Sequence, residues 1–238
     1  MSTHARTVLR ARRELLRLVI FDCDGVLIDS EPIADRVVAK ELAAVGWSIT
    51  PAEAHSRFLG MRTPDMPPII EAMLGRPLPE GWAANVAERM IVAMAQEAVL
   101  IPGAIEALDA ADAVGLDWRI ASNSGPRQLA AKFAATGLTQ RVAGRVLSAS
   151  DIVAGGGRGK PAPDIFLAAA GQAGCAPANC LVIEDSAIGV RGAVAAGMQC
   201  LGFASEGDGS HLIAEGAVPF HSMFDLPDLL RLAREATP

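Results

Sequence analysis

The amino-acid sequence predicts an α/β protein: a doubly wound parallel sheet into which a second, α-helical unit is inserted. Strand and helix patterns alternate from residue 101 to the end of the chain, and one further strand pattern, Leu18 to Phe21, lies far upstream. Between them, residues 32–100 show only helical periodicity. Because regular strand–helix alternation builds a parallel sheet with helices on both faces, we expect the upstream strand to join that sheet and the helical segment to interrupt it.

We therefore expect three regions: a basic N-terminal extension of residues 1–17, an α/β core of residues 18–31 and 101–238, and a helical cap of residues 32–100. The extension carries five arginines and one acid, Glu14. This composition suits a transit peptide, but a frayed or helical extension is the favoured interpretation. Since every motif described below begins after residue 17, we expect the extension to be dispensable for chemistry.

The composition excludes several classes of protein. A chain of 238 residues that is 51% hydrophobic supplies a full core for one large domain or for a domain with a sizeable insert. No run of about eighteen apolar residues occurs, so no membrane span is predicted. The net charge of −6 argues against a nucleic-acid-binding surface. We expect neither a nucleic acid nor a membrane as a partner.

The cysteines indicate the compartment. Cys23, Cys175, Cys180 and Cys200 lack the paired spacing of a metal site, and no secretory signal is evident. We interpret them as reduced thiols of a cytoplasmic protein. Cys23 is interpreted as a buried filler rather than a redox group, because strand alternation turns it away from its two neighbours.

The cap is predicted to contain several helices and no strand. Residues 32–45 have a proline suited to the first helical position and an apolar face, and residues 50–53 form a capping box that starts a second helix. Residues 63–64 can open another helix, which the proline pair at 67–68 should keep short or kinked. The apolar spacing of residues 82–98 predicts one long amphipathic helix.

The core is predicted to alternate between strands and helices. The expected strands are 118–121, 146–147, 180–183 and 199–203, and the expected helices are 103–115, 126–136, 187–196 and 226–235, with one more helix after Asp164.

Two carboxylates follow the first strand directly. Leu18 to Phe21 is an unbroken apolar run, typical of a strand buried on both faces, and Asp22, Asp24 and Gly25 come after it. A strand followed by a simple Asp-Gly turn is the alternative. Because the carboxyl ends of parallel strands are where open α/β sheets place their chemistry, we interpret both acids as functional.

Polar residues follow two other strands and one loop. Ser122 and Asn123 end one strand, Glu184 and Asp185 end another, and Lys160 follows a glycine-rich loop. Taken singly, these residues could be helix caps or a surface loop. Because parallel strands end at one edge of the sheet, together they predict a single site.

These segments resemble the signatures of the haloacid dehalogenase superfamily, and the resemblance covers nearly the whole chain. Phe21 to Glu31 is similar to the first signature, Ser122 to the hydroxyl of the second, Lys160 to the loop lysine, and Glu184-Asp185 to the acidic pair. A helical cap directly after the first signature is similar to the β-phosphoglucomutase and phosphoglycolate phosphatase subfamily. The resemblance implies a Rossmann-like core and the activity of a phosphoric monoester hydrolase.

The resemblance also implies roles for the site residues. Asp22 would attack phosphorus and form an aspartyl-phosphate, and Asp24 would protonate the leaving alcohol and then accept a proton from water. Ser122 and the backbone N–H of Asn123 would bind the transferring oxygens, and Ser124 would contact the substrate.

Electrostatic repulsion implies that cations are needed as well. A phosphate monoester carries a charge of about −1.5 to −2, and bringing it within about 4 Å of one carboxylate costs about 8 kcal/mol at an effective dielectric near 20. Mg²⁺ prefers hard oxygen ligands and bridges to phosphate. The resemblance assigns it to Asp22, the backbone carbonyl of Asp24, Asp185 and Glu184. Lys160 would supply a second cation.

Departures from related activities favour hydrolysis. Haloacid dehalogenases proper lack the second acid, which is present here as Asp24. Phosphonoacetaldehyde hydrolases need a cap lysine where this chain has Arg57, and β-phosphoglucomutases carry a histidine where it has Ala34. A β-phosphoglucomutase-like phosphomutase and a non-catalytic binding module on the same fold remain as alternatives.

The expected substrate is a small phosphorylated metabolite, such as a sugar, sugar-acid or polyol phosphate, because a closing cap excludes polymers. Arg57, Gly60 and Arg62 lie in one cap turn. The glycine would let the backbone approach the active site, and one arginine would bind the leaving group. Two solvated surface arginines are the alternative interpretation.

Overall fold

The computed structural model describes residues 3–10 and 15–235, and it confirms the α/β class. Six parallel strands form one sheet in the order β5-β4-β1-β6-β7-β8. Their bounds are β1 Leu18–Phe21, β4 Asp117–Ser122, β5 Val146–Ser148, β6 Cys180–Glu184, β7 Gln199–Phe203 and β8 Val218–Phe220. The first strand of the sequence therefore lies inside the sheet, between β4 and β6.

The sheet divides the hydrophobic core into two layers. Side chains alternate along a strand, so Val19 and Phe21 pack on one face and Leu18 and Ile20 on the other. The first face is covered by α6 (Ala104–Ala113), α7 (Pro126–Ala135) and α12 (Leu226–Glu235), and the second by α8 (Ala149–Ala154), α9 (Asp164–Gln172), α10 (Ala187–Ala195) and α11 (Ser210–Ile213). Among the helices described, none is both long and apolar enough to cross a membrane.

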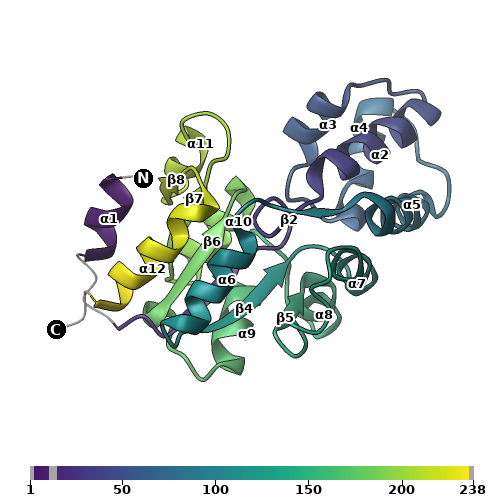
Figure 1. Ribbon diagram of the computed structural model, residues 1–238. Coiled ribbons are helices and arrows are strands. Elements are labelled where there is room, and N and C mark those ends of the chain that lie inside the picture. The colour runs from purple at the N-terminus through teal and green to yellow at the C-terminus, as the bar shows by residue number, and fades with distance from the viewer. Residues whose placement is uncertain (1–2, 11–14, 236–238) are drawn as a thin grey trace.

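The inserted segment is helical and lies to one side of the sheet, at the upper right of Figure 1. It contains α2 (Glu31–Ala44), α3 (Pro51–Phe58), the single 3₁₀ turn η1 (Thr63–Asp65), α4 (Pro67–Leu74) and α5 (Trp82–Glu97). The capping box predicted at α3 is present, because Thr50 and Glu53 each accept a hydrogen bond from the other's backbone N–H. The helix that opens at Thr63-Pro64 is short, as expected, because η1 ends at Asp65, before the proline pair. Pro67 and Pro68 begin α4, where a missing N–H removes no intrahelical hydrogen bond.

The sequence analysis missed several short helices and strands. β2 (Ile28–Asp29) and β3 (Val99–Leu100) pair antiparallel where the chain enters and leaves the helical insert. The expectation that residues 32–100 contain no strand was therefore wrong at Val99 and Leu100. α8, α11 and β8 were also missed. Each of these elements is too short to show a periodic pattern of apolar residues.

The N-terminal extension packs on the core. Residues 3–10 form the helix α1 (Thr3–Arg10), which lies beside α12 and β8 (Figure 1). Ala5 and Leu9 are fully buried in the same hydrophobic layer as α12, and Arg6 lies 3.5 Å from a carboxylate oxygen of Asp228. Residues 3–10 of the extension are thus helical, and α1 contributes to the core rather than fraying from it.

Truncating Leu9 is expected to destabilise the protein. Leu9→Ala removes buried methyl groups and leaves a cavity, which costs about 2–4 kcal/mol in a typical core. Leu15→Ala is the matched control, since Leu15 is 38% exposed. Urea unfolding checks the prediction, and equal midpoints for the two variants would mean that α1 adds nothing to the core.

Candidate active site

Three neighbouring strands deliver their last polar residues to one edge of the sheet. β1 pairs with β4 on one side and β6 on the other, so Asp22, Ser122 and Glu184 come together despite their separation in the sequence. A cavity opens at this edge between the core and the helical insert. The predicted site residues that line it are Asp22, Asp24, Gly60, Arg62, Asn123, Ser124, Lys160 and Asp185.

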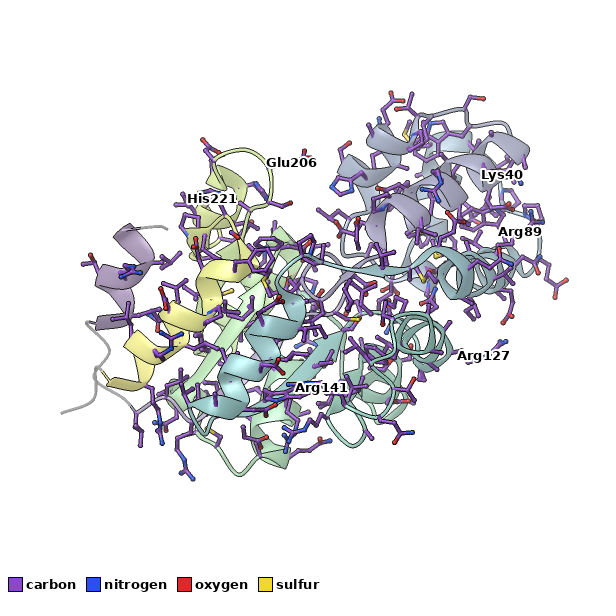
Figure 2. The ribbon with its side chains drawn as sticks, in the orientation of Figure 1. Lys40, Arg89, Arg127, Arg141, Glu206 and His221 are labelled. Atoms are coloured by element: carbon purple, nitrogen blue, oxygen red, sulfur yellow. The ribbon has the colours of Figure 1, made fainter. Side chains whose placement is uncertain are left out.

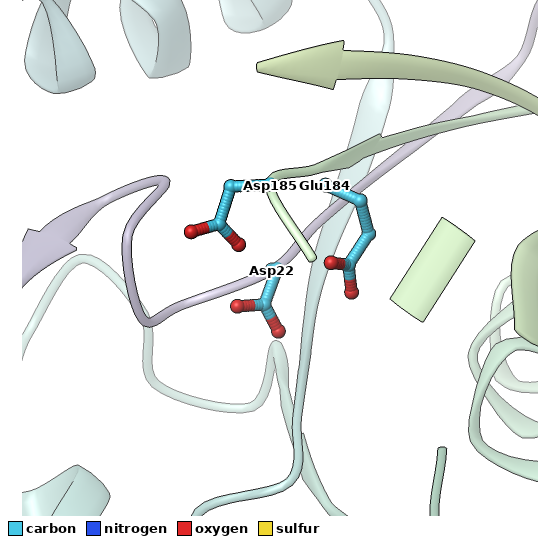
Figure 3. Close-up of side chains that lie close together, drawn as sticks. All are labelled: Asp22, Glu184 and Asp185. Carbon is cyan, nitrogen blue, oxygen red and sulfur yellow. The ribbon is translucent and has the colours of Figure 1, made fainter. Parts of the chain in front are cut away.

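Three carboxylates lie close together at this edge of the sheet (Figure 3). Asp22, Glu184 and Asp185 each offer one oxygen, and these oxygens lie within 4.8 Å of one another. Burial, together with the neighbouring acids and against the effect of Lys160, raises the pKa of Asp22 to about 7. Burial and adjacent carboxylates also raise the pKa of Asp185 well above its ordinary value. A cation would relieve this repulsion, and hard carboxylate oxygens are the ligands that Mg²⁺ prefers.

Two glycines leave the space that these carboxylates occupy. Gly25 has φ of +72°, and a Cβ there would lie 1.8 Å from Oδ2 of Asp185. A Cβ on Gly189 of α10 would lie 2.0 Å from the carboxylate of Glu184. The glycine of the Asp-x-Asp-Gly motif is therefore required by the close approach of Asp185 as well as by the turn.

Lys160 is buried and joins the ends of all three strands. Its Nζ donates to the carboxylate of Asp22, to Oε1 of Glu184 at 2.5 Å and to the carbonyl of Ala121 at 2.7 Å. Burial opposes the charge on Lys160, but the two carboxylates outweigh burial and hold its pKa above the ordinary value. The ammonium group therefore stays charged and offsets part of the acidic cluster.

Both carboxylate oxygens of Glu184 accept hydrogen bonds. Oε1 accepts from Lys160, and Oε2 accepts from the Ser186 hydroxyl at 3.0 Å and from its backbone N–H at 3.3 Å. The side chain is fully buried. Glu184 thus orients Lys160 and the start of α10, and its direct binding to a metal stays a prediction.

Asp24 accepts hydrogen bonds on both oxygens, and one donor is a lysine that the sequence analysis missed. Lys132 of α7 is fully buried, and its Nζ donates to Oδ1 of Asp24 and, at 2.9 Å, to the hydroxyl of Ser124. Ser30 also donates to Oδ1, whereas Ser122 and Ser124 donate to Oδ2 at 3.0 and 2.9 Å. Burial raises the pKa of Asp24, but Lys132 and the hydroxyl donors outweigh burial and lower that pKa to about 2.

A sequence signal for Lys132 did exist. It lies three residues after Leu129 and directly before Phe133, and all three are buried on α7. Positions three and four apart share one face of a helix, so Lys132 occupies a core position of an amphipathic pattern. A charged residue there, in the helix that follows the Ser122 turn, indicates a buried counter-charge.

Asn123 connects the cap to the core through its side chain. Its Nδ2 donates to the carbonyl of Gly60 at 2.7 Å, and its Oδ1 accepts from the backbone N–H of Lys160 at 3.0 Å. Gly60 has φ of +73°, and a Cβ there would lie 3.2 Å from the hydroxyl oxygen of Ser186. The backbone of the cap turn therefore reaches the edge of the core, and the side chain of Asn123 has a bridging role that the sequence analysis did not assign.

The two predicted cap arginines lie in different places. Arg62 lines the cavity, and its Nε lies 3.0 Å from Oδ2 of Asp65. The guanidinium carbon of Arg57 lies 5.4 Å from the ring centroid of Trp47, and Arg57 is not among the described residues that line the cavity. The structure thus brings Arg62, but not Arg57, to the site.

Contacts between α5 and α7 hold the helical insert over the cavity. Arg127 of α7, labelled in Figure 2, pairs with Glu88 of α5. The side-chain amide of Gln128 lies 3.5 Å from the sulfur of Met90, and both residues line the cavity. One helix of the insert therefore packs directly on the helix that carries Lys132.

Comparisons with known proteins identify the family to which the chain belongs. Residues 16–197 match the family model described as haloacid dehalogenase-like hydrolase. The chain belongs to this family. It is 25% identical over 218 residues to the 6-phosphogluconate phosphatase of Escherichia coli (strain K12), which covers 90% of this chain and 94% of that protein. It is 34% identical over 189 residues to a probable pseudouridine-5'-phosphatase of Drosophila melanogaster, and this alignment covers 76% of this chain and 78% of that protein.

A solved structure of the family is similar in sequence and in fold. The crystal structure of a HAD family hydrolase from Deinococcus radiodurans R1, with bound phosphate and sodium, has 32% sequence identity and a TM-score of 0.73. The alignment covers 92% of this chain and 96% of that one. This haloacid dehalogenase-like hydrolase is therefore an enzyme, a phosphoric monoester hydrolase that acts on small phosphorylated molecules.

Replacing Lys132 should destabilise this hydrolase in a pH-dependent way. Lys132→Met leaves the charge of Asp24 buried without its partner, which costs about 3 kcal/mol near pH 7. Because the folded-state pKa of Asp24 is about 2 and its unfolded value is about 4, this stabilisation is complete above about pH 4 and is lost as the pH falls through 2. Unfolding should show a smaller loss near pH 3 than near pH 7. Lys40→Met, at an exposed position of α2 (Figure 2), is the control, and a pH-independent loss for Lys132→Met would argue against the Asp24–Lys132 pairing.

Without divalent ions, the free energy of unfolding should fall as the pH rises. The folded-state pKa of Asp22 is about 7 and its unfolded value is about 4, so the folded protein binds the extra proton between these values and loses stability as the pH rises through them. Added Mg²⁺ should raise the melting temperature more near pH 8 than near pH 5, because metal binding needs ionised carboxylates. Calorimetry in chelator and in Mg²⁺ measures both effects. An equal shift at the two pH values would disagree with the carboxylate cluster as the binding site.

Proposed function

We propose that the protein is a Mg²⁺-dependent phosphatase that hydrolyses a sugar, sugar-acid or polyol phosphate through an aspartyl-phosphate intermediate. The observation that carries this proposal is the meeting of Asp22, the Lys160 ammonium and a buried acidic cluster in one cavity under a helical cap. The Escherichia coli relative is named for 6-phosphogluconate and the Drosophila relative for pseudouridine 5'-phosphate, which supports a small phosphorylated metabolite as the substrate class.

Asp22 is the proposed nucleophile. One of its oxygens accepts from Lys160, which fixes the carboxylate at the cavity wall and leaves the other oxygen to attack. The new bond joins that oxygen to phosphorus, while the bond from phosphorus to the leaving alcohol breaks. Water then attacks the aspartyl-phosphate, releases inorganic phosphate and restores Asp22.

The cations that this step needs come from the protein and from the metal. Asp22, Asp185 and the backbone carbonyl of Asp24 would hold Mg²⁺, with Glu184 bound directly or through water. The ion supplies positive charge to the phosphoryl oxygens. Lys160 contributes a fixed positive charge from the protein itself.

Asp24 is the proposed general acid and base. In the structure it is ionised, which is the form that accepts a proton from the attacking water. A phosphate group brings a further charge of about −1.5 to −2 next to it, and this repulsion raises its pKa so that it can carry a proton to the leaving alcohol. Ser30 and Lys132, which both donate to Oδ1, hold the carboxylate in one position for both steps.

The remaining site residues bind oxygen atoms. Ser122 and the backbone N–H of Asn123 are proposed to bind the transferring oxygens, and Ser124 to contact the substrate. The hydroxyls of Ser122 and Ser124 donate to Asp24 in this structure, and they would donate to the substrate instead when it binds. Gly60 and Arg62 face the leaving group from the cap, whereas Arg57 has no part in the proposal because it lies over Trp47.

The alternatives have less support. A phosphomutase must keep its aspartyl-phosphate from water, and Ala34, where mutases of this subfamily carry a histidine, lines the cavity without a polar group. A binding module has no need of an acid and a lysine in contact inside the cavity, as Asp22 and Lys160 are.

Phosphate release from p-nitrophenyl phosphate with Mg²⁺ tests the proposal. Asp22→Asn should abolish release, and Asp24→Asn should lower kcat by about 10²–10⁴-fold, the usual contribution of general acid–base catalysis, with the fold intact. Asp109→Asn, the same change at an exposed position of α6, should leave release unchanged. Sustained turnover by Asp22→Asn would exclude Asp22 as the nucleophile.

A further inference from the structure

The cap side of the cavity presents carboxylate oxygens that lack hydrogen-bond donors. Glu31 and Asp35 lie four residues apart, which places them on one face of α2, and both line the cavity. Within the described part of the chain, no group donates a hydrogen bond to Glu31. Asp35 pairs with the Nδ1 of His55 through Oδ2 alone, at 2.9 Å. Three carboxylate oxygens on residues that line the cavity therefore have no hydrogen-bond donor among the described residues.

The same lining offers no cation without a carboxylate partner. Of the described residues around the cavity, the positively charged ones are Lys160 and Arg62. Lys160 donates to Asp22 and Glu184. Nε of Arg62 lies 3.0 Å from one carboxylate oxygen of Asp65, and Nη2 lies 3.3 Å from the other. The carboxylates beside these two cations offset part of the attraction that the cations would exert on a second anionic group of the substrate.

Most of the remaining cap lining is apolar, formed by Val38, Phe58, Met61, Met66, Met90 and Met94. Methionine side chains adapt their shape and pack well against C–H surfaces. A carboxylate placed against them would lose hydration and find no partner. The C–H face of a sugar or polyol fits this wall, while its hydroxyls reach the acceptors on α2.

We propose that the cap of this enzyme selects phosphate monoesters whose leaving alcohol carries several hydroxyl groups and no anionic group, that is, neutral sugars and polyols. This inference rests on the proposed phosphatase activity and narrows its substrate class. Hydroxyls of the leaving alcohol donate to Glu31 and Asp35, whereas a carboxylate or a second phosphate is repelled.

A matched pair of substrates tests this selection. Glucitol 6-phosphate and 6-phosphogluconate share their carbon skeleton and differ only at C1, which is a hydroxymethyl group in one and a carboxylate in the other. The kcat/KM for glucitol 6-phosphate should exceed that for 6-phosphogluconate by at least about tenfold, the effect of 1.4 kcal/mol. If neither is turned over, their inhibition constants against p-nitrophenyl phosphate hydrolysis supply the same ratio. Equal or better use of 6-phosphogluconate overturns the inference.

Neutral isosteres assign the selection to its residues. Glu31→Gln and Asp35→Asn should each reduce the ratio between the two substrates several-fold, because a carboxylate then meets less repulsion. Asp109→Asn removes the same charge at an exposed position of α6, outside the cavity, and should leave the ratio unchanged. An unchanged ratio in both cavity variants overturns the inference. If the wild-type protein releases phosphate from none of these substrates, p-nitrophenyl phosphate included, the result contradicts the phosphatase proposal itself.

Discussion

The ammonium group of Lys160 donates to Asp22, to Glu184 and to the carbonyl of Ala121, and so ties together the ends of β1, β6 and β4. Two unit negative charges about 4 Å apart repel by about 4 kcal/mol at an effective dielectric near 20, and burial adds a desolvation cost. A parallel sheet that gathers acids at one edge therefore needs a buried cation there. Gly25 and Gly189 are the other part of this constraint, because a side chain at either would collide with a carboxylate.

A second buried lysine, Lys132, places a positive charge next to Asp24, the other acid of the Asp-x-Asp motif. Lys132 reaches Asp24 from α7, the helix on which α5 of the cap packs. The carboxamide of Asn123 also links the cap turn to the backbone of Lys160. The two lysines place buried positive charge beside these acids in a chain whose net charge is −6. The contacts that position the cap and the contacts that offset the charges of the acids thus lie together at one edge of the sheet.

The sequence predicted the sheet and the position of Lys160 because both depend on chain order: apolar runs that end in polar residues must meet at one edge of a parallel sheet. It did not predict the partner of Asp24, because Lys132 lies inside a helix, where only the tertiary fold shows what a buried charge faces. Arg57 and Arg62 looked equivalent because they share one turn. Packing of Arg57 on the ring of Trp47 distinguishes them. The pairing of β2 with β3 and the burial of α1 depend on contacts that no local pattern records.

The site of covalent attachment is the most direct test of this account. A brief reaction with a substrate that carries a radiolabelled phosphoryl group, quenched in acid and followed by peptide mapping, would locate the label. The account predicts an acyl phosphate on Asp22, the nucleophile that Lys160 holds at the cavity, and no label in the Asp22→Asn variant. A label on any other residue, or turnover with oxygen transfer from water to phosphate in a single step, would contradict it.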